Sequence, residues 1–158
     1  MTTALSPTGT SAPPASLRSA PMPPAMDVDE LQVFLDSAFP SDLPYTVEEV
    51  TDAGMRLRLA VDESNVRPGG TVSGPSLMAL ADCAAWLAIV GRIGPVALAV
   101  TTSLHIDFLR KPALVDVVAV GTVLKLGSRL GVVDVALHSV ADDALVAKAQ
   151  VTYSIPPR

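Results

Sequence analysis

The chain has 158 residues, of which 49% are apolar and only 4% aromatic, and its formal net charge is −5 at pH 7. This length fits one domain of ordinary size, with a core built mostly from Val, Leu, Ile and Ala. The 11 Lys and Arg residues are scattered, which argues against nucleic-acid binding because that function needs clustered positive charge. The single Cys excludes an internal disulfide.

The first segment, residues 1–26, is rich in Pro, Ala, Ser and Thr and has almost no large apolar side chains. Such a composition cannot bury enough surface to offset the entropy of ordering. We therefore predict a flexible tail over residues 1–26 and a single domain over residues 27–158. A secretory signal is not predicted, because the sequence shows no basic stretch followed by an apolar stretch. The protein is therefore expected in the cytoplasm.

A short amphipathic helix is predicted next, from the N-cap residue Asp27 to about Ala38. Its apolar residues recur at spacings of three and four, at Val28, Leu31, Phe34 and Leu35. We expect this helix to lie across the edge of the core. The segments Tyr45–Thr51 and Met55–Val61 alternate between apolar and polar residues around a turn at Gly54, which predicts a β-hairpin.

A second helix is predicted from Pro75 to about Val90, ended by Gly91 and Gly94. Its faces are all apolar, and from Leu77 to Val90 the only ionisable groups are Asp82 and the Cys83 thiol. A helix apolar all round belongs inside a protein, where an unpaired carboxylate costs roughly several kcal/mol. Asp82 is therefore the first place to look for function. A membrane span is not expected, because it needs ~20 residues and avoids a central charge.

The rest of the chain is predicted to form four Val-rich strands in an antiparallel meander. The strands are expected at Ala97–Phe108, Asp116–Leu126, Leu130–Val140 and Leu145–Ile155. A long apolar helix between a hairpin and a meander can hide its whole circumference only if a strongly curved sheet wraps around it. The predicted class is α+β.

Three linked motifs narrow this reading. They are Gly69-Gly70-Thr71-Val72-Ser73-Gly74-Pro75, then Leu80-Ala81-Asp82, then Val100-Thr101-Thr102-Ser103-Leu104-His105-Ile106-Asp107-Phe108-Leu109-Arg110-Lys111-Pro112. In this order, over about residues 45–155, they resemble acyl-CoA thioesterases of the phenylacetate-pathway type. That family has the hotdog fold, a curved antiparallel sheet around one long helix.

The resemblance implies roles for three residues: the Gly74 amide polarises the thioester carbonyl, Asp82 attacks directly or activates water, and Thr101 helps to hold that water. Thioester hydrolysis needs such donors for the oxygen and a carboxylate for the carbon. The substrate is expected to be an acyl-CoA, with no cofactor and no metal ion.

The chain departs from the family at two positions: Ser73 stands where the family has His, and Arg67 where it tends to have Asn. Asn65, two residues earlier, is a candidate substitute. Together with Ser73 and Pro75 it is predicted to bind substrate. Ser73-Gly74-Pro75 could equally be no more than a good helix cap.

The site is expected to need a second subunit. Asp82 lies ~10 Å along the helix axis from Pro75, so both cannot face one substrate atom from the same chain. The resemblance implies antiparallel pairing of two helices in a homodimer or homotetramer. Arg110, Lys111 and Arg129 are the available partners for the phosphates of coenzyme A, or are solvated turn charges.

Other residues have simpler interpretations. His105, on one strand face with Thr101, Ser103 and Asp107, is expected at a subunit contact or in solvent. Cys83 has no cationic neighbour in sequence to favour its thiolate and is read as a small buried hydrophobe. Asp82 itself could be a buried structural carboxylate.

Two other functions are open. A non-catalytic acyl-CoA binding module is suggested by Ser73 and Arg67. A hotdog enoyl-CoA hydratase ranks last, because that branch resembles an Asp followed five residues later by His, whereas Asp62 is followed there by Arg67.

Overall fold

The computed structural model describes residues 23–39 and 41–157. Most of the predicted tail therefore lies outside the described residues, and its flexibility stays a prediction. The elements in chain order are α1 (Val28–Ala38), β1 (Tyr45–Val50), β2 (Gly54–Leu59), a 3-10 turn (Glu63–Asn65), β3 (Val66–Arg67), β4 (Thr71–Val72), α2 (Gly74–Ile93), β5 (Val100–Phe108), β6 (Val117–Leu126), β7 (Leu130–Ser139) and β8 (Leu145–Ser154).

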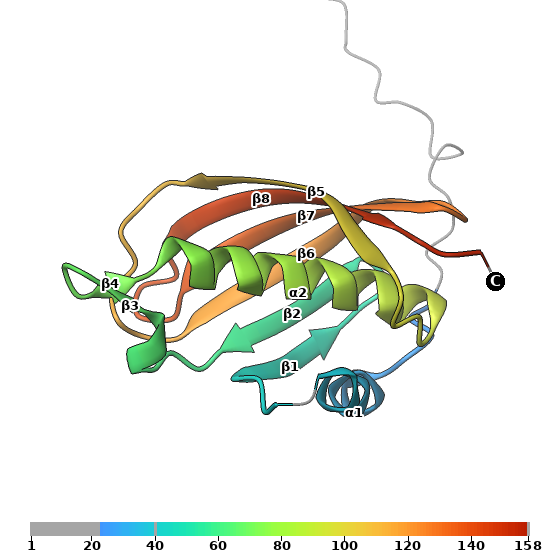
Figure 1. The fold of residues 1–158 in the computed structure, drawn as a ribbon, viewed down its shortest axis with the longest axis horizontal. Coiled ribbons are helices and arrows are strands. Elements are labelled where there is room, and N and C mark those ends of the chain that lie inside the picture. The colour runs from blue at the N-terminus through green and yellow to red at the C-terminus, as the bar shows by residue number, and fades with distance from the viewer. Residues whose placement is uncertain (1–22, 40, 158) are drawn as a thin grey trace, which may run out of the picture.

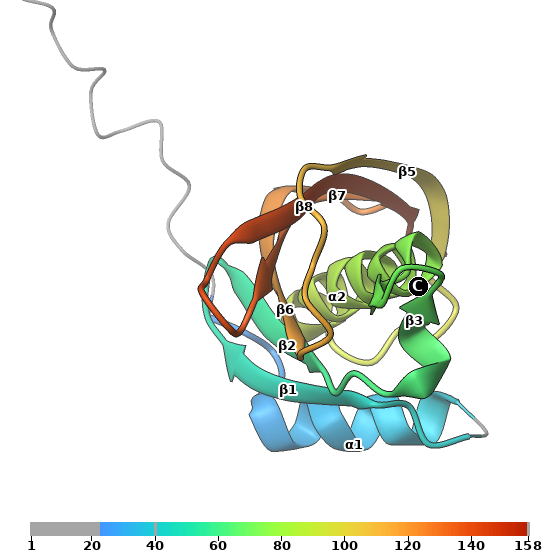
Figure 2. The same cartoon turned by 90° about the vertical axis from the view of Figure 1, so that its left-hand side faces the viewer.

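Six strands form one antiparallel sheet in the order β1-β2-β6-β7-β8-β5. The sheet curves around α2, which runs along its concave side (Figures 1 and 2). This arrangement confirms the predicted hotdog fold. The small hairpin β3–β4 was not predicted, because arms of two residues are too short to carry a visible alternation.

The ends of α2 follow from local chemistry. Ser73 is the N-cap, and its side chain accepts a hydrogen bond from the Ser76 N–H. Gly94, with φ 88°, is the C-cap, a backbone conformation in which an L side chain would be strained. The expectation that Gly91 closes the helix is wrong: Gly91 is helical and buried, and its carbonyl accepts hydrogen bonds from the N–H groups of Ala25 and Met26.

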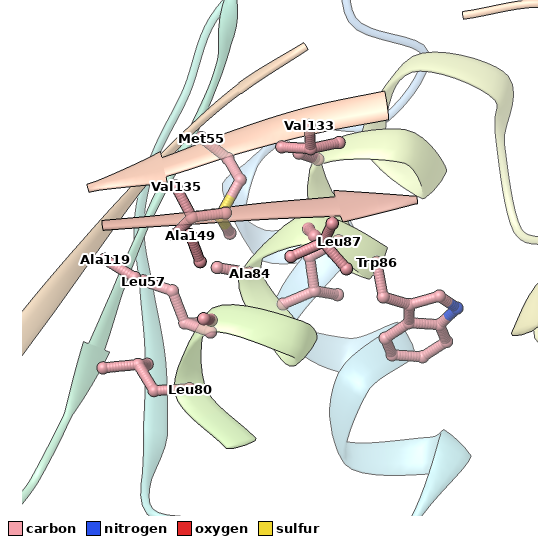
Figure 3. Packing of buried hydrophobic residues seen from close by; sticks show 14 of the residues in the cluster. Met55, Leu57, Leu80, Ala84, Trp86, Leu87, Ala119, Val133, Val135 and Ala149 are labelled. Atoms are coloured by element: carbon pink, nitrogen blue, oxygen red, sulfur yellow. The ribbon is translucent and has the colours of Figure 1, made fainter. Parts of the chain in front are cut away.

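The core lies between α2 and the concave face of the sheet. Figure 3 shows Leu57, Ala119 and Val135 of the sheet packed around Ala84 and Leu87 of α2. Close packing of this kind supplies most of the stabilisation of a small domain.

As predicted, α1 lies at the edge of the core, beside β1 (Figure 2). Leu31 and Leu35 are fully buried. The Gln32 side chain binds the outer edge of β1, accepting from the Val47 N–H at 2.8 Å and donating to the Tyr45 carbonyl at 3.3 Å. This contact protects one edge of the sheet. At the other edge, β5 pairs only with β8.

The sheet does not hide the whole circumference of α2, contrary to expectation. Pro75, Met78 and Ala79 are exposed and Asp82 and Cys83 are half-buried, a spacing that places all five on one stripe of the helix. The side chains of Phe34 and Phe39 cover Trp86 farther along, with ring centroids 5.2 and 5.8 Å from it. The described residues thus leave the N-terminal half of the stripe uncovered. By length and composition alone α2 could cross a membrane, but most of it is buried in the domain, as in a core helix.

Candidate active site

Asp82 is held by two hydroxyl groups from two neighbouring strands. The Thr101 hydroxyl on β5 and the Tyr153 hydroxyl on β8 each donate to Asp82 Oδ1 at 2.8 Å. The Tyr153 oxygen also lies 3.1 Å from the backbone carbonyl oxygen of Asp82. Asp82 Oδ2 accepts no hydrogen bond from the described part of the chain. One carboxylate oxygen is therefore fixed and the other is left for a ligand.

The contact with Thr101 depends on a β-bulge. Thr101 pairs with Tyr153, but Ser103 pairs with Thr152, so Thr102 is an extra residue in β5. A bulge shifts the alternation of a strand by one position. Thr101 thereby faces Asp82 together with Tyr153.

The same bulge corrects the expectation that His105, Ser103 and Asp107 share a face with Thr101. The three lie beyond the extra residue, on the opposite face of β5, and all are exposed. His105 Nε2 lies 3.3 Å from Asp107 Oδ2. These residues do not reach Asp82.

A cavity of about 590 Å³ opens beside Asp82. Its walls are mostly apolar and aromatic, with Phe39, Leu43 and Tyr45 before the central helix, Trp86 on it, and Ala99 and Val100 after it. A space of this size is typical of small-molecule sites. Tyr153 and Tyr45 are the residues at this site that the sequence reasoning missed. A signal for Tyr153 existed, since it is the one inward residue of β8 with a polar head, after Ala147, Ala149 and Val151.

Burial keeps the other ionisable groups around Asp82 neutral. It raises the pKa of the Cys83 thiol to about 12, with a further contribution from the charge of Asp82. Burial likewise raises the pKa of Tyr45 to about 12 and raises the pKa of Tyr153 above its ordinary value. Cys83 therefore lacks the thiolate that a nucleophilic cysteine needs. Both tyrosines stay protonated, and Tyr153 keeps the proton that it donates to Asp82.

The start of α2 offers one free backbone donor. The Ser76 N–H is taken by the Ser73 hydroxyl, and Pro75 has no N–H. The Gly74 N–H donates no hydrogen bond to any residue that the structure describes. Because a helix N-terminus carries partial positive charge, this amide is suited to a carbonyl oxygen or another anionic atom.

Asn65 supports that helix start from inside. It is only 9% exposed, its carbonyl accepts from the Ser73 N–H at 2.7 Å, and its side-chain amide donates to the Ser76 hydroxyl at 3.2 Å. The side-chain oxygen accepts from the Asp62 N–H at 2.9 Å. Substrate binding by Asn65 stays a prediction, while its observed contacts position the helix cap.

A second cavity, of about 410 Å³, surrounds the helix start. Gly74 lies in it with three cationic residues, Arg67, Arg110 and Lys111. Arg110 and Lys111 thus share this cavity with Arg67, and phosphate binding by Arg110 and Lys111 stays a prediction. The Phe108 ring lies over Gly74, where an added Cβ would come within 3.4 Å of it.

Arg129 lies elsewhere. It borders a separate cavity with Arg92, at the C-terminal end of α2. In one chain it therefore does not join Arg110 and Lys111. Among the described residues, no group of three His, Cys, Asp or Glu side chains could hold a metal ion.

Asp82 and Gly74 open onto different cavities of the same chain. Asp82 lies eight positions after Gly74 on the helix, or ~12 Å along the axis. One bound carbonyl group cannot meet both within a single chain. A composite site would need a second copy.

The comparisons with known proteins agree with this architecture. A family model described as the thioesterase superfamily matches residues 69–146. A protein of Halobacterium salinarum, provisionally named an esterase, is 37% identical over 114 residues, which are 69% of this chain and 75% of that protein. A provisionally named esterase of Thermoplasma acidophilum is 23% identical over 127 residues, covering 80% of this chain and 95% of that protein.

Solved structures are also similar to this chain. A crystal structure of a provisionally named thioesterase from Silicibacter has 40% sequence identity and a TM-score of 0.79, covering 87% of this chain and 97% of that chain. Zebra fish thioesterase superfamily member 2 has 19% identity and a TM-score of 0.74, covering 84% of this chain and 100% of that chain. The second likeness is one of fold alone.

Proposed function

This chain belongs to the thioesterase superfamily, and from that premise we propose that it hydrolyses acyl-CoA thioesters to a free acid and coenzyme A. Family membership supports thioester hydrolysis in general. Coenzyme A as the carrier, the phenylacetate-pathway type and the residues that act are the proposed part.

The observation that carries the proposal is the unequal hydrogen bonding of the two carboxylate oxygens of Asp82. Its Oδ1 is fixed by Thr101 and Tyr153, and its Oδ2, beside a mostly apolar cavity of about 590 Å³, has no partner among the described residues. A carboxylate that acts on a bound acyl group needs one oxygen free.

In the proposed reaction, Asp82 Oδ2 takes a proton from a water molecule as the water oxygen attacks the carbonyl carbon. The carbonyl oxygen becomes negative and accepts a hydrogen bond from the Gly74 N–H of a second copy. The C–S bond then breaks, and the proton held by Asp82 passes to the departing thiolate. Direct attack by Oδ2, with an anhydride later hydrolysed by water, uses the same geometry.

The helix geometry supports one arrangement of the proposed second copy. If antiparallel α2 helices set Gly74 of one chain opposite Asp82 of the other, the two-fold axis passes near position 78, midway between them. Met78 lies there and is 41% exposed. The uncovered stripe of α2 and the open edge of β5 are then available for the contact. We propose a homodimer, or a homotetramer built from it.

The cationic cavity suits the nucleotide end of the substrate. Arg67, Arg110 and Lys111 could meet the phosphates of coenzyme A while the Gly74 amide meets the carbonyl group. The acyl group would then occupy the cavity beside Asp82 of the other chain.

The test is a thiol-release screen over short, medium, long and aryl acyl-CoAs, with Asp82→Asn as the matched control. We expect release from at least one class, and loss of release in the variant. The same acyl groups on pantetheine, which lacks the nucleotide, should give a higher KM. No release from any thioester would reject the proposal.

A non-catalytic acyl-CoA binding protein is the second candidate. The Ser73 hydroxyl, at the family's His position, caps α2 and lies 2.8 Å from the Ser76 hydroxyl. No imidazole is therefore present next to the Gly74 amide. Saturable binding of acyl-CoA without thiol release would favour this candidate.

A further inference from the structure

We infer that Tyr153 is a positioning residue of the Asp82 site, which with Thr101 fixes one carboxylate oxygen so that the other alone is presented to substrate or water. This inference rests on the proposed function. It concerns a residue outside the three motifs, to which the sequence analysis assigned no role.

The two donors form a cross-strand pair. Thr101 of β5 and Tyr153 of β8 are direct neighbours in the antiparallel register, and the bulge at Thr102 turns Thr101 to the same face as Tyr153. A regular strand in phase with the inward residue Leu104 would present Thr102 instead. The register and the bulge together bring both hydroxyl groups to Asp82 Oδ1.

Tyr153 also restrains the side chain of Asp82 against its own backbone. The hydroxyl oxygen lies 2.8 Å from Oδ1 and 3.1 Å from the backbone carbonyl oxygen of the same residue. Tyr153 is itself 4% exposed and held in the core. A carboxylate tied in this way has little freedom to rotate, so its free oxygen keeps one direction. Such preorganisation lowers the barrier for attack at a bound carbonyl.

The titratable groups that face Asp82 are few. Among the described residues of the same chain they are Tyr45 from β1, Cys83 from α2 and Tyr153 from β8. Burial raises the pKa of each of them, so none changes charge near neutral pH. In the proposed assembly the partner adds only Arg and Lys side chains, which stay charged near neutral pH. A change in the acid limb of the pH profile on removal of a hydroxyl therefore reports on the Asp82 carboxylate.

The experiment compares Tyr153→Phe and Thr101→Val with the parent, using the best acyl-CoA from the screen. Each variant loses one hydroxyl and keeps nearly the same shape. We expect kcat to fall about tenfold in each with KM little changed. Because each hydroxyl donates to the charged carboxylate, its removal should move the acid limb of kcat to higher pH.

Thr102→Val is the matched control. Its hydroxyl donates to the Thr152 carbonyl at 3.2 Å, so the variant removes a neighbouring hydroxyl on the same strand without touching Asp82. It should keep both kcat and the acid limb. Melting temperatures of all three variants confirm that folded proteins are compared.

A second measurement separates this inference from the proposed function. The Asp82 side-chain carboxyl is followed by carbon NMR as a function of pH in the parent and in Tyr153→Phe, with no substrate present. A midpoint that rises in the variant supports the positioning role. An unchanged midpoint, or an unchanged acid limb with full kcat, overturns it. Absence of thiol release from the parent rejects the hydrolase proposal but leaves the carboxyl titration to decide on Tyr153.

Discussion

The change Asp82→Asn separates a catalytic carboxylate from a structural one. Asn keeps the shape of Asp and an oxygen that can still accept from Thr101 and Tyr153, whose hydroxyl groups lie 2.8 Å from Oδ1. The amide nitrogen replaces Oδ2, the oxygen without a partner in the described chain. The variant thus removes charge and basicity while leaving the surrounding contacts in place.

The expected cost to stability is small. A hydrogen bond to a charged acceptor contributes about 1.5–3 kcal/mol and one to a neutral acceptor about 0.5–1.5 kcal/mol. Two weakened bonds lose about 2 kcal/mol together, and the smaller desolvation of an amide offsets part of this loss. We expect the free energy of unfolding to change by no more than about 2 kcal/mol in either direction.

The expected cost to catalysis is larger. Loss of a general base lowers turnover by ~10²-fold or more, equivalent to at least about 2.7 kcal/mol in the activation barrier. Thiol release should be measured per folded molecule, with chemical denaturation of the same samples as the stability assay. If the folded variant hydrolyses every acyl-CoA at the parent's rate, Asp82 is structural and the reasoning from its free oxygen is wrong.

Further expectations concern the assembly, the cationic cavity, the buried thiol and the N-terminal segment. Met78→Arg places a charge at the proposed two-fold axis and should give an inactive monomer. Light scattering measures the mass and thiol release the activity, and an active monomer contradicts the composite site. The double change Arg110→Ala and Lys111→Ala should raise KM for acyl-CoA and reduce the salt dependence of KM, with kcat little changed. Arg129→Ala, at the other end of α2, should have the smaller effect on KM. A larger effect of Arg129→Ala would instead indicate that the nucleotide binds at that end. Burial raises the pKa of Cys83 to about 12, so Cys83 should resist alkylation at pH 8, and rapid alkylation of the native protein would contradict this expectation. Because the unfolded thiol ionises near pH ~8.5, burial of its neutral form stabilises the fold below that pH, and this contribution is lost as the pH rises toward 12. Cys83→Ala should therefore lessen the loss of stability at alkaline pH. A chain that begins at Pro23 should keep the melting temperature of the full chain, because residues 1–22 have a composition that cannot build a core. Further removal of Ala25 and Met26 deletes their hydrogen bonds to Gly91 and should lower the melting temperature.

The sequence determined by itself those features that depend on neighbours a few residues apart. Asp27 and the spacing of Leu31 and Leu35 defined α1, and Ser73 defined the start of α2. Alternation indicated β1 and β2, and Val-rich stretches between turns indicated β5 to β8. These signals are local, since caps and periodic burial act within a few residues. The prediction that Gly91 ends α2 was wrong because it used only this local signal. Glycine is compatible with a helix end, but contacts with the rest of the domain decide whether the helix continues.

The tertiary structure alone decided how the site is assembled. The alternation of β5 placed Thr101 and His105 on one face, and a bulge paired across to β8 put them on opposite faces. Tyr153 reaches Asp82 across 71 positions of sequence, and Arg129 borders a different cavity from Arg110. Strand register and bulges are set by packing of the whole sheet, so no pattern within one strand could reveal which hydroxyl groups meet the carboxylate.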